Sequence, residues 1–166
     1  MNTNSEQHSI SLLVANKPGV LIRIALVFSR RGYNLDSVVV SPTHNSHFSR
    51  MNIVASGNRE TLSQIIKQLG KLVDVIHVAD HTGEDIVEGE LLFIKVACGK
   101  EQRTELLQIA DHFKARSVDL TEDSITFEAT GKSAKLNAFQ AMLEQYGILE
   151  SVRSGKLIIA RGRQQT

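Results

Sequence analysis

"VANKPGVLIRIALVFSRRGYNLDSVVVS", residues 14–41, joins a strand to a helix and that helix to a second strand. Residues 9–15 alternate between apolar and other side chains, which is the period of a strand. Apolar residues then recur at helical spacing from Val20 to Arg31, and Gly32 stands where helices end. The β-branched run from Asn34 to Ser41 predicts the next strand. The stretch therefore predicts a strand–helix–strand unit.

The following residues complete this unit. "HFSRMNIVASG" (47–57) predicts a strand, and an apolar stripe then marks a second helix. "VDVIHVAD" (73–80) predicts the last strand. The order βαββαβ within about 70 residues is that of a ferredoxin-like unit.

The same order returns after "HTGEDIVEGE" (81–90), an acidic stretch that we interpret as a linker. "LLFIKVA" (91–97) predicts a strand, and "ILESVRSGKLIIA" (148–160) supplies the closing strand. We therefore predict an α+β fold of two tandem ferredoxin-like units, residues 8–80 and 91–162. The strands are apolar on both faces, so each sheet needs cover beyond its own helices, which predicts a dimer or a higher assembly.

Composition narrows the class of protein. The 166 residues contain 19 Lys and Arg against 18 Asp and Glu, so nothing indicates binding to nucleic acid. The single cysteine, Cys98, fits a reducing compartment, and no apolar run approaches the length of a membrane span. We expect a cytoplasmic protein with neither a nucleic-acid nor a membrane partner.

The residues at the start of the first predicted helix, here called the helix mouth, differ from what the fold alone requires. Gly19 permits close approach of a ligand, and Pro18 fits the first helical turn, where its missing N–H is not needed. The N–H groups of Gly19, Val20 and Leu21 would then face outward at the positive end of the helix dipole. This arrangement suits a small anion such as a carboxylate.

Two asparagines extend this possible site. Asn16 precedes the helix, and we expect Asn34, at the start of the next strand, to lie beside it. Together they could hold both ends of an α-amino acid, with Val20 and Leu35 receiving its side chain. The alternative is that Asn16 is only an N-cap and Gly19 only a tight turn, and the residues alone leave both interpretations open.

Nothing else in the chain indicates chemistry. The matching place in the second unit, "ACGKEQRTEL" (97–106), has no Pro and no Asn, so we expect that unit to serve assembly or transmission. His44 and His47 share one loop without further metal ligands, and no catalytic motif is present. We therefore expect no catalytic residues and no metal site.

Several stretches together resemble one family. They are "NKPGVLIRIALVFSRRGYNLDSVVVSPT" (16–43), "FSRMNIVASG" (48–57), "IIKQLGKLVDVIHV" (65–78), "SAKLNAFQAML" (133–143) and "SGKLIIARG" (154–162). Their amino-acid sequences and their order along the chain resemble those of the regulatory (small) subunit of acetolactate synthase, also called acetohydroxyacid synthase. The resemblance covers roughly residues 8–162.

The resemblance implies an amino-acid-binding ACT domain followed by a second ferredoxin-like domain. It implies a non-catalytic subunit that activates a large catalytic subunit and confers feedback inhibition by branched-chain amino acids, usually valine. Thiamine diphosphate, FAD and Mg would belong to the large subunit, and this chain would hold only the amino-acid effector. A free-standing ACT-type sensor acting on another partner is the alternative.

The resemblance also places the effector site. Family effector sites lie where two ACT domains meet in a homodimer, and the matching positions here are Asn16, Gly19, Val20, Leu21 and Asn34. With their neighbours Lys17, Pro18, Ile22 and Leu35 they form the expected valine site. Ile22 departs from the family, in which many members have a small polar residue. On this resemblance, the helix mouth is the site of an amino-acid carboxylate.

Overall fold

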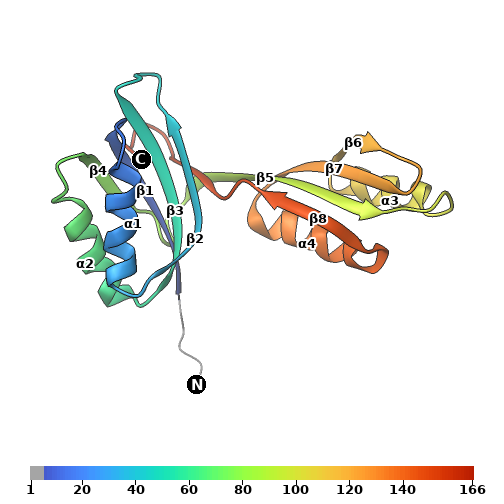
Figure 1. The fold of residues 1–166 in the computed structure, drawn as a ribbon, viewed down its shortest axis with the longest axis horizontal. Helices are drawn as coiled ribbons and strands as arrows, with labels where there is room; N and C mark the ends of the chain where they lie inside the picture. Colours follow the sequence, from blue (N-terminus) through green and yellow to red (C-terminus); the bar gives the residue numbers. More distant parts are fainter. Residues whose placement is uncertain (1–5) are drawn as a thin grey trace. The chain divides into compact units, whose positions relative to one another are not determined.

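The computed structural model describes residues 6–166, which form two compact units (Figure 1). The first unit follows the predicted order βαββαβ. Its elements are β1 (Glu6–Ala15), α1 (Val20–Arg30), β2 (Asn34–Pro42), β3 (Phe48–Gly57), α2 (Arg59–Leu69) and β4 (Val75–Asp80). The strands form one antiparallel sheet in the order β2-β3-β1-β4, and both helices cover the same face (Figure 1). The ferredoxin-like prediction is confirmed.

The core of the first unit lies between this sheet and the two helices. Alternate residues of β1 (Ile10, Leu12 and Val14) are buried, as the period of a strand requires. One stripe of α1 meets them through Ile24 and Phe28. Burying a side chain of this size stabilises the fold by about 1.5–3 kcal/mol. Both helices are therefore held in place by their apolar stripes.

The second unit repeats the pattern. Its elements are β5 (Ile86–Ala97), α3 (Arg103–His112), β6 (Arg116–Leu120), β7 (Ser124–Gly131), α4 (Ser133–Leu143), a 3₁₀ turn (Glu144–Tyr146) and β8 (Ile148–Arg153). The strand order β6-β7-β5-β8 corresponds to that of the first sheet. Phe127 and Phe139 pack edge to face at the centre of the core, with ring centroids 6.0 Å apart. No helix among residues 6–166 is both long and apolar enough to cross a membrane.

The end of the chain differs from the expected division. The stretch 148–160 is not one strand, because it breaks at Gly155 (φ 82°) and continues as β9 (Leu157–Ala160), which pairs with β5. Residues 156–166 belong to the first unit rather than the second. Arg50 Nη1 of β3 donates to the Thr166 carbonyl oxygen at 2.6 Å, and Ile158 of β9 is buried. Polar contacts and apolar burial thus hold the chain end on the first unit.

The acidic stretch 81–90 is also more structured than a linker. His81 and Ile86 are buried, and β5 has already begun at Ile86. Glu90 is buried as well, where it accepts from Ser133 and pairs with Arg153 Nε at 3.3 Å. The stretch itself contains no basic residue, so the sequence around Glu90 could not show that it pairs with Arg153, which is distant in the chain.

Candidate functional site

The mouth of α1 is a glycine turn. Gly19 is the N-cap residue, with φ 83° and ψ −11°, a left-handed conformation that favours glycine. The first intrahelical hydrogen bond runs from Arg23 N–H to Gly19 O at 3.1 Å. Pro18 lies in the turn before the helix and not in the first helical turn, so that expectation is corrected. The turn is needed because the chain must reverse direction between β1 and α1.

No side chain among residues 6–166 caps α1. The other helix of the unit is different, because Asn58 Oδ1 accepts from Glu60 N–H at 2.7 Å. The first N–H groups of any helix have no intrahelical acceptor, and they carry the positive end of the helix dipole. At α1 the N–H groups from Gly19 to Ile22 precede the first intrahelical bond, so this end of the helix suits an anion.

Asn16 is not the N-cap. Its backbone N–H donates to His47 O at 2.8 Å, and its side-chain Nδ2 donates to Ser46 O at 2.9 Å. Both contacts reach the loop between β2 and β3, and they fix the amide next to the helix mouth. Since Nδ2 is used there, Oδ1 is the atom through which Asn16 can accept from an amine. The interpretation of Asn16 as a simple cap is therefore wrong.

One carboxylate lies near two cations at this end of α1. Asp74, just before β4, pairs with Arg23 and lies 3.8 Å from Lys17 Nζ through Oδ1. Lys17 is well exposed, so its interaction with Asp74 is weakened by solvent screening. One negative and two positive charges leave the helix mouth positive, which adds to the effect of the helix dipole.

Asn34 does not lie beside the helix mouth of its own chain. It pairs with Ser56 near one end of β3, whereas Ala15, at the helix mouth, pairs with Phe48 at the other end. At about 3.3 Å per residue, these two ends are roughly 25 Å apart. The expectation is corrected because α1 runs the length of the sheet, so β2 starts at the end opposite to the mouth.

The apolar residues of the expected site divide into two groups. Val20 is 4% exposed and Leu35 packs against the core, so neither presents its side chain to a ligand at the mouth. Leu21 and Ile22 point away from the core, and Ile22 is 66% exposed. Only these two can meet the side chain of a bound amino acid or a second molecule.

Asn34 is held by a carboxylate that sequence reasoning missed. Its Nδ2 donates to Asp36 Oδ1 at 2.7 Å, and Ser56 and Gln7 donate to the other oxygen of Asp36. Burial acts to raise the pKa of Asp36, but these hydrogen bonds outweigh it and hold the pKa below its ordinary value. The contact leaves Oδ1 of Asn34 as its acceptor for a ligand.

We expect Asp36→Asn to reduce the loss of stability in acid. Because the pKa is lower in the folded state, ionised Asp36 stabilises the fold above its unfolded pKa, and this contribution disappears as the pH falls through the folded pKa. Denaturant unfolding at pH 7 and pH 3 measures it. The difference in free energy of unfolding between wild type and variant should shrink at pH 3, and an unchanged difference would contradict the assignment.

A Ser–His–Glu chain, in which the serine and the histidine are buried and the glutamate is exposed, lies elsewhere in the first unit. Ser11 Oγ is 2.8 Å from His81 Nε2, and His81 Nδ1 is 2.8 Å from Glu84 Oε2. Ser11 is fully buried within a regular strand, so no substrate can reach its hydroxyl. This Ser–His–Glu chain therefore supplies hydrogen-bond partners for the buried side chains of Ser11 and His81. Among residues 6–166 no group of three or more His, Cys, Asp or Glu could hold a metal ion.

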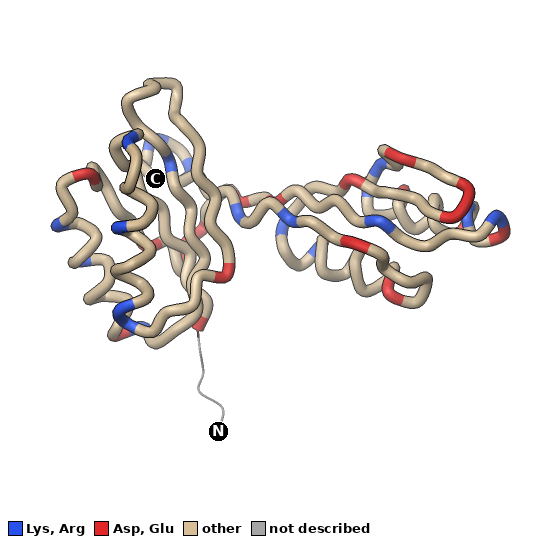
Figure 2. The backbone as a smooth tube through the Cα atoms, viewed as in Figure 1, with Lys and Arg blue, Asp and Glu red and all other residues tan. Residues whose placement is uncertain are grey.

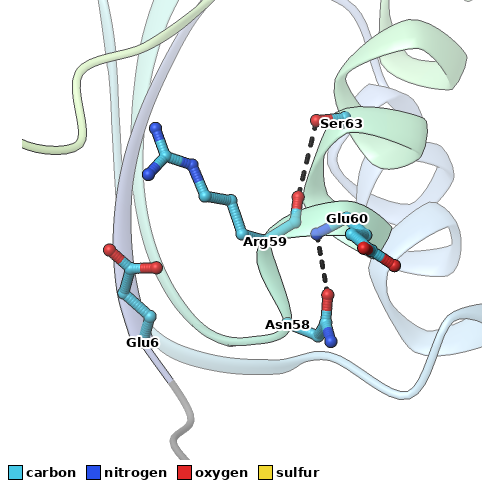
Figure 3. A pocket seen from close by; sticks show the side chains of 5 residues that line it. All are labelled: Glu6, Asn58, Arg59, Glu60 and Ser63. Carbon is cyan, nitrogen blue, oxygen red and sulfur yellow. Dashed lines mark hydrogen bonds between the residues drawn. The ribbon is translucent and has the colours of Figure 1, made fainter.

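A pocket of about 650 Å³ lies at the start of α2 (Figure 3). Its lining residues are Glu6, Asn58, Arg59, Glu60 and Ser63. None of them belongs to the expected amino-acid site. Asn58 already caps this helix, and Ser63 Oγ donates to the carbonyl oxygen of Arg59 (Figure 3). We therefore retain the mouth of α1 as the candidate site.

Comparison with family models divides the chain close to the boundary between the two compact units, which lies after Val87. Residues 10–77 match the model described as an AHAS small subunit-like ACT domain. Residues 89–162 match the model described as the small subunit of acetolactate synthase. The two matches together span most of the sequence.

Individual relatives agree with these matches. A probable acetolactate synthase small subunit of Archaeoglobus fulgidus is 43% identical over 159 residues, 96% of this chain and 99% of the relative. The acetolactate synthase small subunit of Mycolicibacterium smegmatis is 41% identical, covering 98% and 95%. A crystal structure of the small subunit from Thermotoga maritima superposes with a TM-score of 0.85 at 34% identity, covering 96% and 99%.

Proposed function

This chain belongs to the family of acetolactate synthase small subunits, and from that premise we propose that it binds a catalytic large subunit, raises its activity and makes it sensitive to valine. The reaction and its cofactors, thiamine diphosphate, FAD and Mg, would belong to the large subunit. This chain would contribute the amino-acid site and the surfaces of assembly.

The observation that carries the proposal is the uncapped N-terminus of α1. The N–H groups at Gly19 and beyond can donate to the carboxylate of an amino acid, which bears the charge that the helix dipole favours. Asn16 Oδ1 can accept from the α-ammonium group. Leu21 and Ile22 supply exposed apolar surface for a branched aliphatic side chain.

A second copy of the chain completes this site. β2 is an edge strand, with Asn34 at one end, and the mouth of α1 lies at the other end of the sheet. If two copies meet antiparallel along β2, Asn34 of one lies beside Asn16 of the other. Exposed apolar residues of α1 and β2 favour association along this edge. They are Leu21, Ile22, Leu26, Val38 and Val40. A two-fold contact then forms two equivalent sites.

Regulation follows from differential affinity. A ligand shifts an equilibrium only as far as it prefers one arrangement over the other. Valine held between two first units would stabilise one arrangement of the dimer, and the chain links that unit to the second twice, after Val87 and after Gly155. The second unit would then transmit the change to the large subunit.

Thermal unfolding with added amino acids tests the site. A ligand at 100 times its dissociation constant stabilises the native state by about 2.7 kcal/mol, which raises the melting temperature measurably. We expect an increase with valine and its branched relatives and none with lysine or glutamate. The absence of any increase, both for this chain and for its complex with the large subunit, would contradict the proposal.

We expect Asn34→Ala to reduce valine sensitivity at least tenfold without changing maximal activation, because it removes an acceptor supplied across the dimer. Titration of valine inhibition in reconstituted enzyme measures the change. Gln7→Ala is the matched control, since Gln7 also donates to Asp36 but is not placed at the ligand. If both variants reduce valine inhibition equally, the loss comes from the changed surroundings of Asp36 and not from a contact between Asn34 and the ligand.

A further inference from the structure

We propose that a groove between α1 and α2 docks an acidic segment of the catalytic subunit, with its carboxylates on the basic rim of the groove and an apolar side chain on the floor. This inference rests on the proposed function and names a surface for it. The groove has a volume of about 370 Å³. It is lined by Val27, Arg30, Arg31, Gln68, Lys71 and Leu72.

The spacing of these residues builds the groove. Val27, Arg30 and Arg31 are three and four residues apart and share one face of α1. The other wall comes from the end of α2 and the turn after it. Val27 and Leu72 are half-buried and pack against the core, so they form an apolar floor that remains partly open to solvent.

The rim of the groove holds positive charge that the unit does not neutralise. Arg31 donates to the neutral amide of Gln64. Across residues 6–166, no ion pair joins Arg30 or Lys71 to a carboxylate, in contrast to Arg23, which pairs with Asp74. Three cations around an apolar floor fit a partner that carries carboxylates on either side of an apolar side chain.

The near-zero net charge of the whole chain conceals a separation between the units. Residues 1–87 and 156–166 contain eleven Lys and Arg against seven Asp and Glu, a net charge of +4. Residues 88–155 contain eight against eleven, a net charge of −3. Figure 2 shows that Lys and Arg predominate on α1, α2 and the turns that follow them. The helical layer of the first unit is therefore the basic surface of this protein.

The chemistry of the groove favours a protein segment over other anions. Nucleic acid would need a track of cations that follows several phosphates, whereas this rim has only three around a short apolar floor. A second copy of the chain would bring the carboxylates of its own acidic unit, and the experiment below distinguishes that occupant from the catalytic subunit.

α1 takes part in both sites. Its N-terminus is the proposed amino-acid site, and Val27, Arg30 and Arg31 at its other end line the groove, roughly 10–16 Å away along an 11-residue helix. A shift of α1 on binding valine would therefore change the groove directly. Linkage then requires that the large subunit and valine alter each other's affinity by the same factor.

The test titrates activation of the catalytic subunit by full-length variants. Arg30→Glu/Lys71→Glu should raise the concentration for half-maximal activation at least tenfold with an unchanged maximum. The melting temperature should fall only slightly, because Arg30 is a favourable cation in the last turn of α1. The wild-type value should rise toward that of the variant in 0.5 M NaCl, since salt screens exposed charges. Gln68→Trp, which fills the groove without changing charge, should weaken activation in the same way.

Arg59→Glu/Arg163→Glu is the matched control. It makes the same change in charge on exposed residues of the same unit, and it should activate like wild type. If both groove variants activate with the wild-type half-maximal concentration, the groove is not the docking site. If they instead lose only self-association, measured by sedimentation, the groove binds a second copy of the chain and the proposal is likewise overturned. If wild type itself does not activate, the proposed function fails instead.

Discussion

Gly19→Asp should abolish inhibition by valine in reconstituted enzyme while activation stays at the wild-type level. The new carboxylate would stand at the N-terminus of α1 and occupy the place of the ligand carboxylate, so the two negative charges exclude each other. A Cβ at this position meets only Arg23 Nη1 at 3.8 Å, an ordinary contact, so the side chain has room. Valine titration of acetolactate formation measures the loss.

Gly19→Asn separates charge from backbone strain. Both substitutions place a side chain at φ 83°, which costs about 1 kcal/mol and is tolerated best by Asn and Asp. The two variants should therefore lose similar stability, but the neutral amide should retain part of the valine response. If Gly19→Asp leaves inhibition intact, the carboxylate site is not at the mouth of α1.

Ile158→Ala should destabilise the first unit by roughly 2–5 kcal/mol, the usual cost of such a cavity in a core. Ile158 is 5% exposed on β9, which belongs to that unit although it follows the second unit in sequence. Hydrogen exchange measures the effect separately in each unit. Amides of β1 and β3 should lose protection, and amides of β7 should keep it.

Ile159→Ala is the matched control for this prediction. The neighbouring isoleucine is 60% exposed, so its truncation should change stability by less than about 0.5 kcal/mol. Faster exchange in β7 with unchanged exchange in β1 would place the chain end with the second unit, and would contradict the division that the structure shows.

Local patterns in the sequence predicted most elements. The alternation at Ile10, Leu12 and Val14 and the helical spacing of Ile24 and Phe28 correspond to buried faces in the structure. Burial selects apolar side chains at the period of each element, and that period can be read along the chain. The break at Gly155 was missed because the apolar residues on either side of it both suit a strand.

The candidate site could be predicted only in part. Pro18 and Gly19 marked a special helix start because a residue of fixed φ and one without a side chain limit the backbone directly. The position of Asn34 relative to Asn16 could not be obtained in this way. Both residues flank α1 in sequence, but the helix carries the chain to the far end of the sheet.

The sequence by itself determined two ferredoxin-like units and an unusual helix start at Pro18 and Gly19, because periodicity and backbone preference are local properties. Only the tertiary structure decided that Asn16 bonds to the β2–β3 loop, that Asp36 holds Asn34 and that residues 156–166 return to the first unit. The basic groove between α1 and α2 likewise unites residues about 40 positions apart. Such contacts depend on how whole elements pack, and no local pattern encodes them.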